Sequence, residues 1–123
     1  VLLAIGVTPD THLAKEAGLR LGIRGSIAVN ERMETSCEGV FVAGDTTGVE
    51  EANTALEEGK IAGISAAEDL GLLTADAASD KRAEIWNRLH SLRLGPFGER
   101  RMIEKEVVMD EYKERIGTPS PIQ

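Results

Sequence analysis

The stretch GVFVAGD, from Gly39 to Asp45, constrains the fold more than any other part of this 123-residue sequence. Its four central apolar residues are typical of a short buried strand, which a glycine and a carboxylate then end. From Val49 to about Leu70, small and apolar residues recur every three or four positions, as on one face of a helix. The sequence therefore predicts a buried strand that passes through a tight turn into a long helix, as in α/β folds.

Further elements are predicted on both sides of this strand–helix unit. The opening residues, VLLAIG at 1–6, indicate another buried strand, and HLAKEAG at 12–18 indicates one or two helical turns. After a stop at Gly71, two more helices are predicted, over 80–94 and over 100–116. The first of these carries its apolar stripe at Ile85, Leu89 and Leu92. Because the chain begins inside a strand, we expect it to be cut from a longer protein.

The composition excludes several classes of partner and site. The net charge is −7, and residues 1–79 hold 13 of the 21 acidic residues but 5 of the 14 basic ones, which argues against nucleic acid as the main partner. The apolar runs are too short to cross a bilayer, so we expect no membrane association. The single cysteine, Cys37, excludes an intrachain disulfide and a cysteine-rich metal site, and fits a reducing, cytoplasmic location.

The turn after the central strand has the chemistry of a nucleotide-binding corner. The first backbone N–H groups of a helix lack partners within it and, together with the helix dipole, favour anions. Asp45, just before such a terminus, can accept hydrogen bonds from sugar hydroxyls, and Gly44 and Gly48 leave room for a ligand. The alternative is structural: Asp45, Thr46 or Thr47 caps the helix, and the glycines serve the turn.

Two motifs occur in order in this region, AIGVTPDTHL at 4–13 and GSIAVNERMETSCEGVFVAGD at 25–45. The first resembles the segment by which the pyridine-nucleotide domain returns to the FAD domain in the FAD- and NAD(P)-dependent pyridine nucleotide-disulphide oxidoreductase family. The second resembles the stretch that follows there, which carries the second FAD signature. The matching residues are Ala4, Ile5, Gly6, Pro9 and Leu13 in the first motif, and Thr35, Ser36, Gly39, Val40, Phe41, Ala43, Gly44 and Asp45 in the second.

The resemblance implies an FAD-binding role for this corner. Asp45 would hydrogen-bond the ribityl chain next to the pyrophosphate, and the following helix would point its N-terminus at the pyrimidine end of the flavin. The implied cofactor-binding residues are Gly44, Asp45, Thr46, Val49, Glu50, Glu51 and Ala52. Backbone donors from Val49 to Ala52 are the strongest candidates for contact with the flavin. The carboxylates of Glu50 and Glu51 also suit the first turn of a helix without any ligand, and we favour that structural interpretation.

For the fold, the resemblance implies an α/β segment. Residues 1–72 would be part of a Rossmann-like FAD-binding domain, with short strands and a long helix, and residues 73–123 a helical C-terminal extension. For function, it implies a fragment of an FAD-dependent oxidoreductase that transfers a hydride with NAD(P)H or an amine-type substrate. The chain has no G-x-G-x-x-G phosphate loop, so the remainder of the parent flavoprotein would supply that loop and the NAD(P) site. No catalytic residue is expected here, and the isolated fragment is expected to be inactive.

An alternative function stays open from the sequence: a non-catalytic subunit or assembly module that completes its fold on a partner chain. The helices of the C-terminal extension are expected to pack on the parent FAD domain or, alternatively, to dock a second subunit.

Two glycines on the long helix, Gly59 and Gly63, lie four residues apart on one face. Each costs about 1 kcal/mol relative to alanine in a helix interior. We therefore expect another backbone close to them, from the absent part of the FAD domain or, alternatively, from another helix of this chain.

Overall fold

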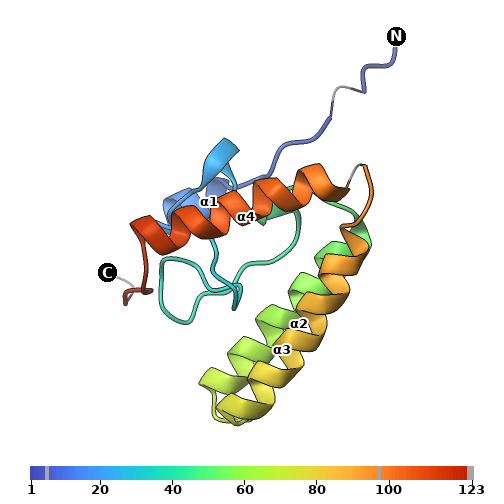
Figure 1. The fold of residues 1–123 in the computed structure, drawn as a ribbon. Helices are drawn as coiled ribbons and strands as arrows, with labels where there is room; N and C mark the ends of the chain where they lie inside the picture. Colours follow the sequence, from blue (N-terminus) through green and yellow to red (C-terminus); the bar gives the residue numbers. More distant parts are fainter. Residues whose placement is uncertain (5, 97, 122–123) are drawn as a thin grey trace.

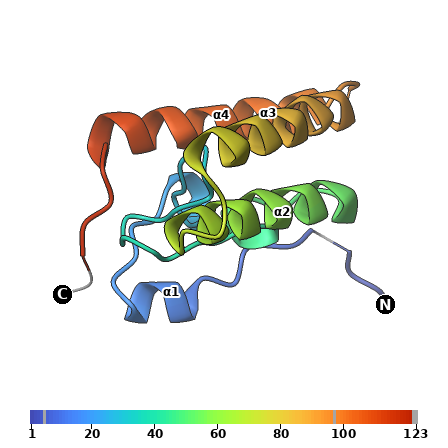
Figure 2. The same cartoon turned by 90° about the horizontal axis from the view of Figure 1, so that it is seen from below.

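The computed structural model describes residues 1–4, 6–96 and 98–121 and is mainly helical (Figure 1). Its α-helices are α1 (His12–Glu16), α2 (Ala52–Asp69), α3 (Ala75–Leu92) and α4 (Gly98–Arg115), and two 3₁₀ turns, η1 (Ile23–Gly25) and η2 (Asp45–Thr47), lie between α1 and α2. Helices α2 and α3 form an antiparallel pair, and α4 leaves one end of that pair and runs over the irregular chain between α1 and α2 (Figures 1 and 2).

The strands predicted at 1–6 and 39–44 are not formed in this structure. Within the described residues, which exclude Ile5, the chain has no β-strand, and pairing is reduced to isolated bridges such as the antiparallel one between Glu34 and Phe41. A strand forms only where a neighbouring strand takes up its N–H and C=O groups. Residues 1–4 instead extend away from the body as an exposed arm (Figure 1). The short strands of the expected α/β segment are therefore absent here, whereas its long helix and helical tail are present.

The predicted long helix is confirmed as α2, although it begins later than the predicted start at Val49. It ends where Gly71 was predicted to stop it. Gly71 has a φ of +72° and donates its N–H to the carbonyl of Glu68 (2.9 Å), while the N–H of Leu72 bonds to the carbonyl of Ala67 (2.8 Å). This pair of bonds satisfies the last carbonyls of a helix and requires a left-handed residue, which explains the glycine.

The two predicted C-terminal helices are confirmed as α3 and α4. Helix α3 begins earlier than the pattern predicted, at Ala75, because the hydroxyl of Thr74 accepts a hydrogen bond from the N–H of Ala77 (3.3 Å). Such a side-chain cap satisfies one of the unpaired donors at a helix start.

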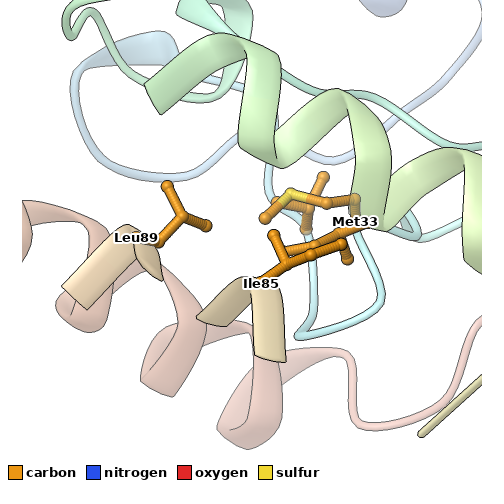
Figure 3. Close-up of a cluster of buried hydrophobic side chains, with 5 residues drawn as sticks. Met33, Ile85 and Leu89 are labelled. Atoms are coloured by element: carbon orange, nitrogen blue, oxygen red, sulfur yellow. The ribbon is translucent and has the colours of Figure 1, made fainter. Parts of the chain in front are cut away.

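A small apolar core joins the α2–α3 pair to the loop that precedes η2. Figure 3 shows Met33, from that loop, and Ile85 and Leu89, from α3, directed into the space between the helices. The buried members of this core are Val29, Met33, Ile61, Ile85 and Leu89. Of the three residues on the predicted apolar stripe, Ile85 and Leu89 are buried in this core, whereas Leu92 is 43 % exposed.

The predicted apolar face of α2 points away from this core. Leu56 is 61 % exposed, and a Cβ atom added at Gly59 or Gly63 would meet no atom of the described residues within 4 Å. No other helix in the described part of the chain therefore crosses α2 at its glycines. The residues that α2 buries are Thr54, Glu57, Glu58, Ile61 and Ser65.

Helix α4 is fixed to the irregular chain beneath it by Tyr112. The Tyr112 side chain is almost fully buried, and its hydroxyl donates a hydrogen bond to the carbonyl of Thr35 (2.9 Å). Since Thr35 belongs to the second sequence motif, at 25–45, this bond connects α4 directly to that motif.

We expect Tyr112 to make stability depend on pH in the alkaline range. Burial, together with the nearby Glu34 carboxylate, raises the pKa of Tyr112 to about 12, whereas an exposed tyrosine titrates near 10. The unfolded chain then loses its proton first, so the free energy of unfolding falls as the pH rises from about 10 to about 12. Urea unfolding at a series of pH values should show this decline in the wild type. A decline of equal steepness in Tyr112→Phe, which has no phenol to ionise, would contradict the assignment.

Candidate functional site

The turn between the predicted strand and α2 depends on its two glycines. Turn η2 is flanked by Gly44, with a φ of +83°, and by Gly48, with a φ of +134°. Side chains rarely adopt such backbone angles, so a larger residue at either position would strain the turn. A Cβ atom at Gly48 would also lie only 3.1 Å from Cε of Lys105. The shape of the turn thus requires both glycines of the sequence pattern Gly-Asp-Thr-Thr-Gly.

The Asp45 side chain is exposed and connects this turn to the segment before α2. Its carboxylate accepts a hydrogen bond from the N–H of Glu50 at 3.4 Å. The neighbouring Thr46 hydroxyl donates to the carbonyl of Ala43, also at 3.4 Å. Both contacts stay N-terminal to α2, which begins at Ala52. In this structure these two side chains therefore stabilise the turn and do not cap the helix.

The start of α2 has no cap from its own N-cap residue. Among the described residues, the Glu51 side chain makes no capping hydrogen bond, and it forms an exposed ion pair with Arg101 of α4 at 3.0 Å instead. The predicted backbone donors from Val49 to Ala52 lie just before α2 or at its first residue. Among them, the N–H of Glu50 donates a hydrogen bond to the Asp45 carboxylate.

Beneath the turn lies a cluster of charged side chains that we call the buried ion cluster: Glu50, Glu58, Arg93 and Lys105. The side chain of each is at most 7 % exposed. Arg93 binds both carboxylate oxygens of Glu50, each at 3.0 Å, and Oε1 of Glu58 at 2.8 Å. Lys105 Nζ lies 2.6 Å from the same Glu58 oxygen and 3.7 Å from Glu50. Two carboxylates thus face two cations, so the cluster is electrically balanced.

The buried ion cluster also holds the backbone of the turn. The second oxygen of Glu58, Oε2, accepts a hydrogen bond from the N–H of Gly44 at 2.9 Å and lies 3.1 Å from the hydroxyl of Thr47. Lys105 Nζ donates to that hydroxyl at 2.7 Å. Bonds to charged groups contribute more than neutral ones, about 1.5–3 kcal/mol each. The turn is therefore anchored from below by groups on α2 and α4.

Sequence reasoning missed three of the four cluster residues. Glu50 is among the predicted cofactor-binding residues, and its carboxylate is bound within the chain by Arg93. Glu58 and Lys105 stand among other charged residues in the sequence, a pattern that is typical of a solvated face. Arg93 stands between two leucines, Leu92 and Leu94.

A cleft of about 950 Å³ opens beside the turn. It lies between residues 6–9, which follow the N-terminal arm, residues 47–50 at the end of the turn, and α4. Of the seven predicted cofactor-binding residues, Val49 and Glu50 line this cleft. The other five, Gly44, Asp45, Thr46, Glu51 and Ala52, lie outside the lining of this cleft, along the chain before and after these two.

Comparison with known proteins places this turn in a family. A family model described as pyridine nucleotide-disulphide oxidoreductase matches residues 1–59, which include the arm, both motifs, the turn and the start of α2. Residues 1–59, just under half of the chain, thus match the pyridine nucleotide-disulphide oxidoreductase family. Members of the family depend on a flavin and NAD(P)H.

Curated relatives agree with this family assignment. An NAD(P)H coenzyme A polysulfide/persulfide reductase of Pyrococcus horikoshii is 51 % identical over 45 residues, which are 37 % of this chain and 10 % of the relative. An NADH oxidase of Methanocaldococcus jannaschii is 36 % identical over 74 residues, 51 % of this chain and 16 % of the relative. An opine oxidase subunit of Rhizobium meliloti is 36 % identical over 84 residues, 64 % of this chain and 16 % of the relative. The chain thus spans a small part of these relatives. No solved structure matches it.

In the described part of the chain, no helix combines the length and the apolarity that crossing a bilayer requires.

Proposed function

We propose that this chain is the second FAD-binding segment of a longer NAD(P)H-dependent flavoprotein oxidoreductase. The observation that carries the proposal is the family match over residues 1–59, with an exposed carboxylate at Asp45 beside the start of a long helix. The chain covers about a tenth of the Pyrococcus relative, so the phosphate loop and the NAD(P) site would be supplied by the remainder of the parent protein.

The residues present fit this cofactor. Gly44 and Gly48, both with positive φ, add no side chain of their own to the turn, and Asp45 presents its carboxylate to solvent there. An exposed carboxylate accepts hydrogen bonds from sugar hydroxyls, and the positive end of the α2 dipole favours negative charge nearby. In the proposed holoprotein Asp45 would hold the ribityl chain, and the backbone from Val49 to Ala52 would face the flavin. The bound FAD supplies the ring that accepts or gives the hydride, and this chain binds and orients it.

Replacing Asp45 with alanine in the full-length flavoprotein tests this role. A hydrogen bond to a charged group is worth about 1.5–3 kcal/mol, so we expect FAD affinity to fall by roughly ten- to a hundredfold. Titration of the apoprotein with FAD, followed by flavin fluorescence, measures the loss.

The matched control is Asp10→Ala. Asp10 is also an exposed turn carboxylate, and it also bonds a nearby backbone N–H, that of His12 at 3.3 Å. Its replacement should leave FAD affinity unchanged. Wild-type affinity in Asp45→Ala would overturn the proposed contact with the cofactor.

The exposed face of α2 supports the remainder of the parent flavoprotein as the main partner. The face holds Leu56 and the two glycines, Gly59 and Gly63, with no described side chain over them. Glycines at this spacing allow close approach of another backbone. The apolar side chains of the arm, Leu2 and Leu3, are exposed as well and would complete a strand in the parent sheet. Docking of a second subunit on α4, where Ile103 and Val107 are exposed, is the less favoured arrangement.

We further propose a cytoplasmic location and a boundary between the FAD-domain segment and the C-terminal extension at position 72. The boundary is supported by the helix ends, because α2 stops at Asp69 and α3 starts at Ala75. The single cysteine supports the location.

A further inference from the structure

The two C-terminal helices each insert one cation beneath the proposed FAD-binding turn. Arg93 directly follows α3 and Lys105 lies within α4, and both are buried. Burying an isolated charge is costly, so such residues persist only where they are paired. Here the carboxylates that pair with them come from the other side of the chain, from Glu50 before α2 and Glu58 within it.

These contacts fix both ends of the turn. At its start, Glu58 Oε2 accepts the N–H of Gly44, a residue in a left-handed backbone conformation. At its end, Arg93 binds both oxygens of Glu50, whose own N–H is bonded to Asp45. Bidentate contacts between a guanidinium and a carboxylate restrict orientation as well as distance. The position of the Asp45 carboxylate thus depends, through Glu50, on Arg93.

We propose that Arg93 and Lys105 are positioning residues for the flavin: through Glu50 and Glu58 they set the geometry and the local charge of the turn that binds it. This inference rests on the proposed function. The cluster holds two carboxylates and two cations, and removing either cation leaves one net negative charge beneath the turn. Negative charge near a flavin disfavours its reduction, so the midpoint potential would shift to a more negative value.

The test uses the full-length flavoprotein with Arg93→Met or Lys105→Met. Its two readouts are the FAD dissociation constant and the midpoint potential of the bound flavin, at a temperature where circular dichroism shows each variant folded. We expect FAD binding to weaken at least about tenfold and the potential to become more negative. Arg93→Lys should restore the potential but only part of the affinity, because lysine keeps the charge and loses the bidentate contact.

The matched control is Leu89→Ala, which removes core packing one turn before Arg93 without touching the cluster. It should leave both readouts unchanged even though it lowers stability. If both methionine variants failed to fold, the double variant Glu50→Gln with Arg93→Gln would take their place, because it removes one charge of each sign. For this double variant we expect weaker FAD binding and an unchanged midpoint potential.

The outcomes separate the two proposals. A wild-type protein that cannot be loaded with FAD overturns the proposed function itself. If the wild type binds FAD and the cation variants, or the double variant, bind it equally well, only the positioning role is overturned. Equal losses in Leu89→Ala and the cation variants would also overturn it, because they would reflect stability alone.

Discussion

Arg93→Met is expected to lower the free energy of unfolding by about 3–5 kcal/mol, which is a large part of the stability of a small domain. The guanidinium makes three hydrogen bonds to Glu50 and Glu58, and it is 5 % exposed. Without it, the buried carboxylate of Glu50 keeps only the longer contact to Lys105 at 3.7 Å. The cost arises from this uncompensated charge more than from the lost attraction. Urea unfolding followed by circular dichroism measures the difference.

Arg100→Met is the matched control, because it makes the same substitution on α4 at a surface ion pair. Arg100 is 81 % exposed and lies 3.9 Å from Glu104. Exposed pairs contribute about 0–1 kcal/mol, so a small change is expected there. Similar losses in Arg93→Met and Arg100→Met would show that Arg93 is not buried in a balanced cluster.

Leu89→Ala is expected to cost about 2–5 kcal/mol. The side chain is fully buried among Met33, Ile61 and Ile85 at the contact between α2 and α3. Its removal loses the transfer free energy of the missing methyl groups and leaves a cavity that close-packed neighbours fill only in part. The same unfolding measurement applies. Leu92→Ala, three residues further along α3 and 43 % exposed, should cost less than half as much; equal costs would mean that the core lies elsewhere.

The helices were predictable from sequence because they depend on local patterns. The stop at Gly71 follows from a backbone angle that glycine adopts readily, and the apolar spacing of α3 marks Ile85 and Leu89. The strands were not predictable as formed elements, since a strand depends on the neighbour that pairs with it. In the described residues, the segment 39–44 has one bridge, at Phe41, and so remains irregular.

The missed members of the buried ion cluster did leave a signal in the sequence. Arg93 follows Ile85 and Leu89 at steps of four, so it continues the buried stripe, whereas Leu92 leaves it. Lys105 precedes Val108 and Tyr112 at steps of three and four, on the buried face of α4. A cation within an apolar stripe indicates a buried carboxylate partner. Which carboxylates pair with it depends on tertiary contacts between residues up to 55 positions apart, which a linear pattern does not contain.

The hydrogen bond from Gly44 to Glu58 limits which C-terminal segments can replace α3 and α4 in this protein. The carboxylate that holds the turn is neutralised by residues that lie 35 and 47 positions later in the chain. A different tail grafted after α2 would have to bring two cations of its own to the same place, or Glu58 would have to change with it. The last two helices and Glu58 therefore form one structural unit, and in a chimera that ignores this pairing we expect the turn at Gly44 to lose its fixed geometry first.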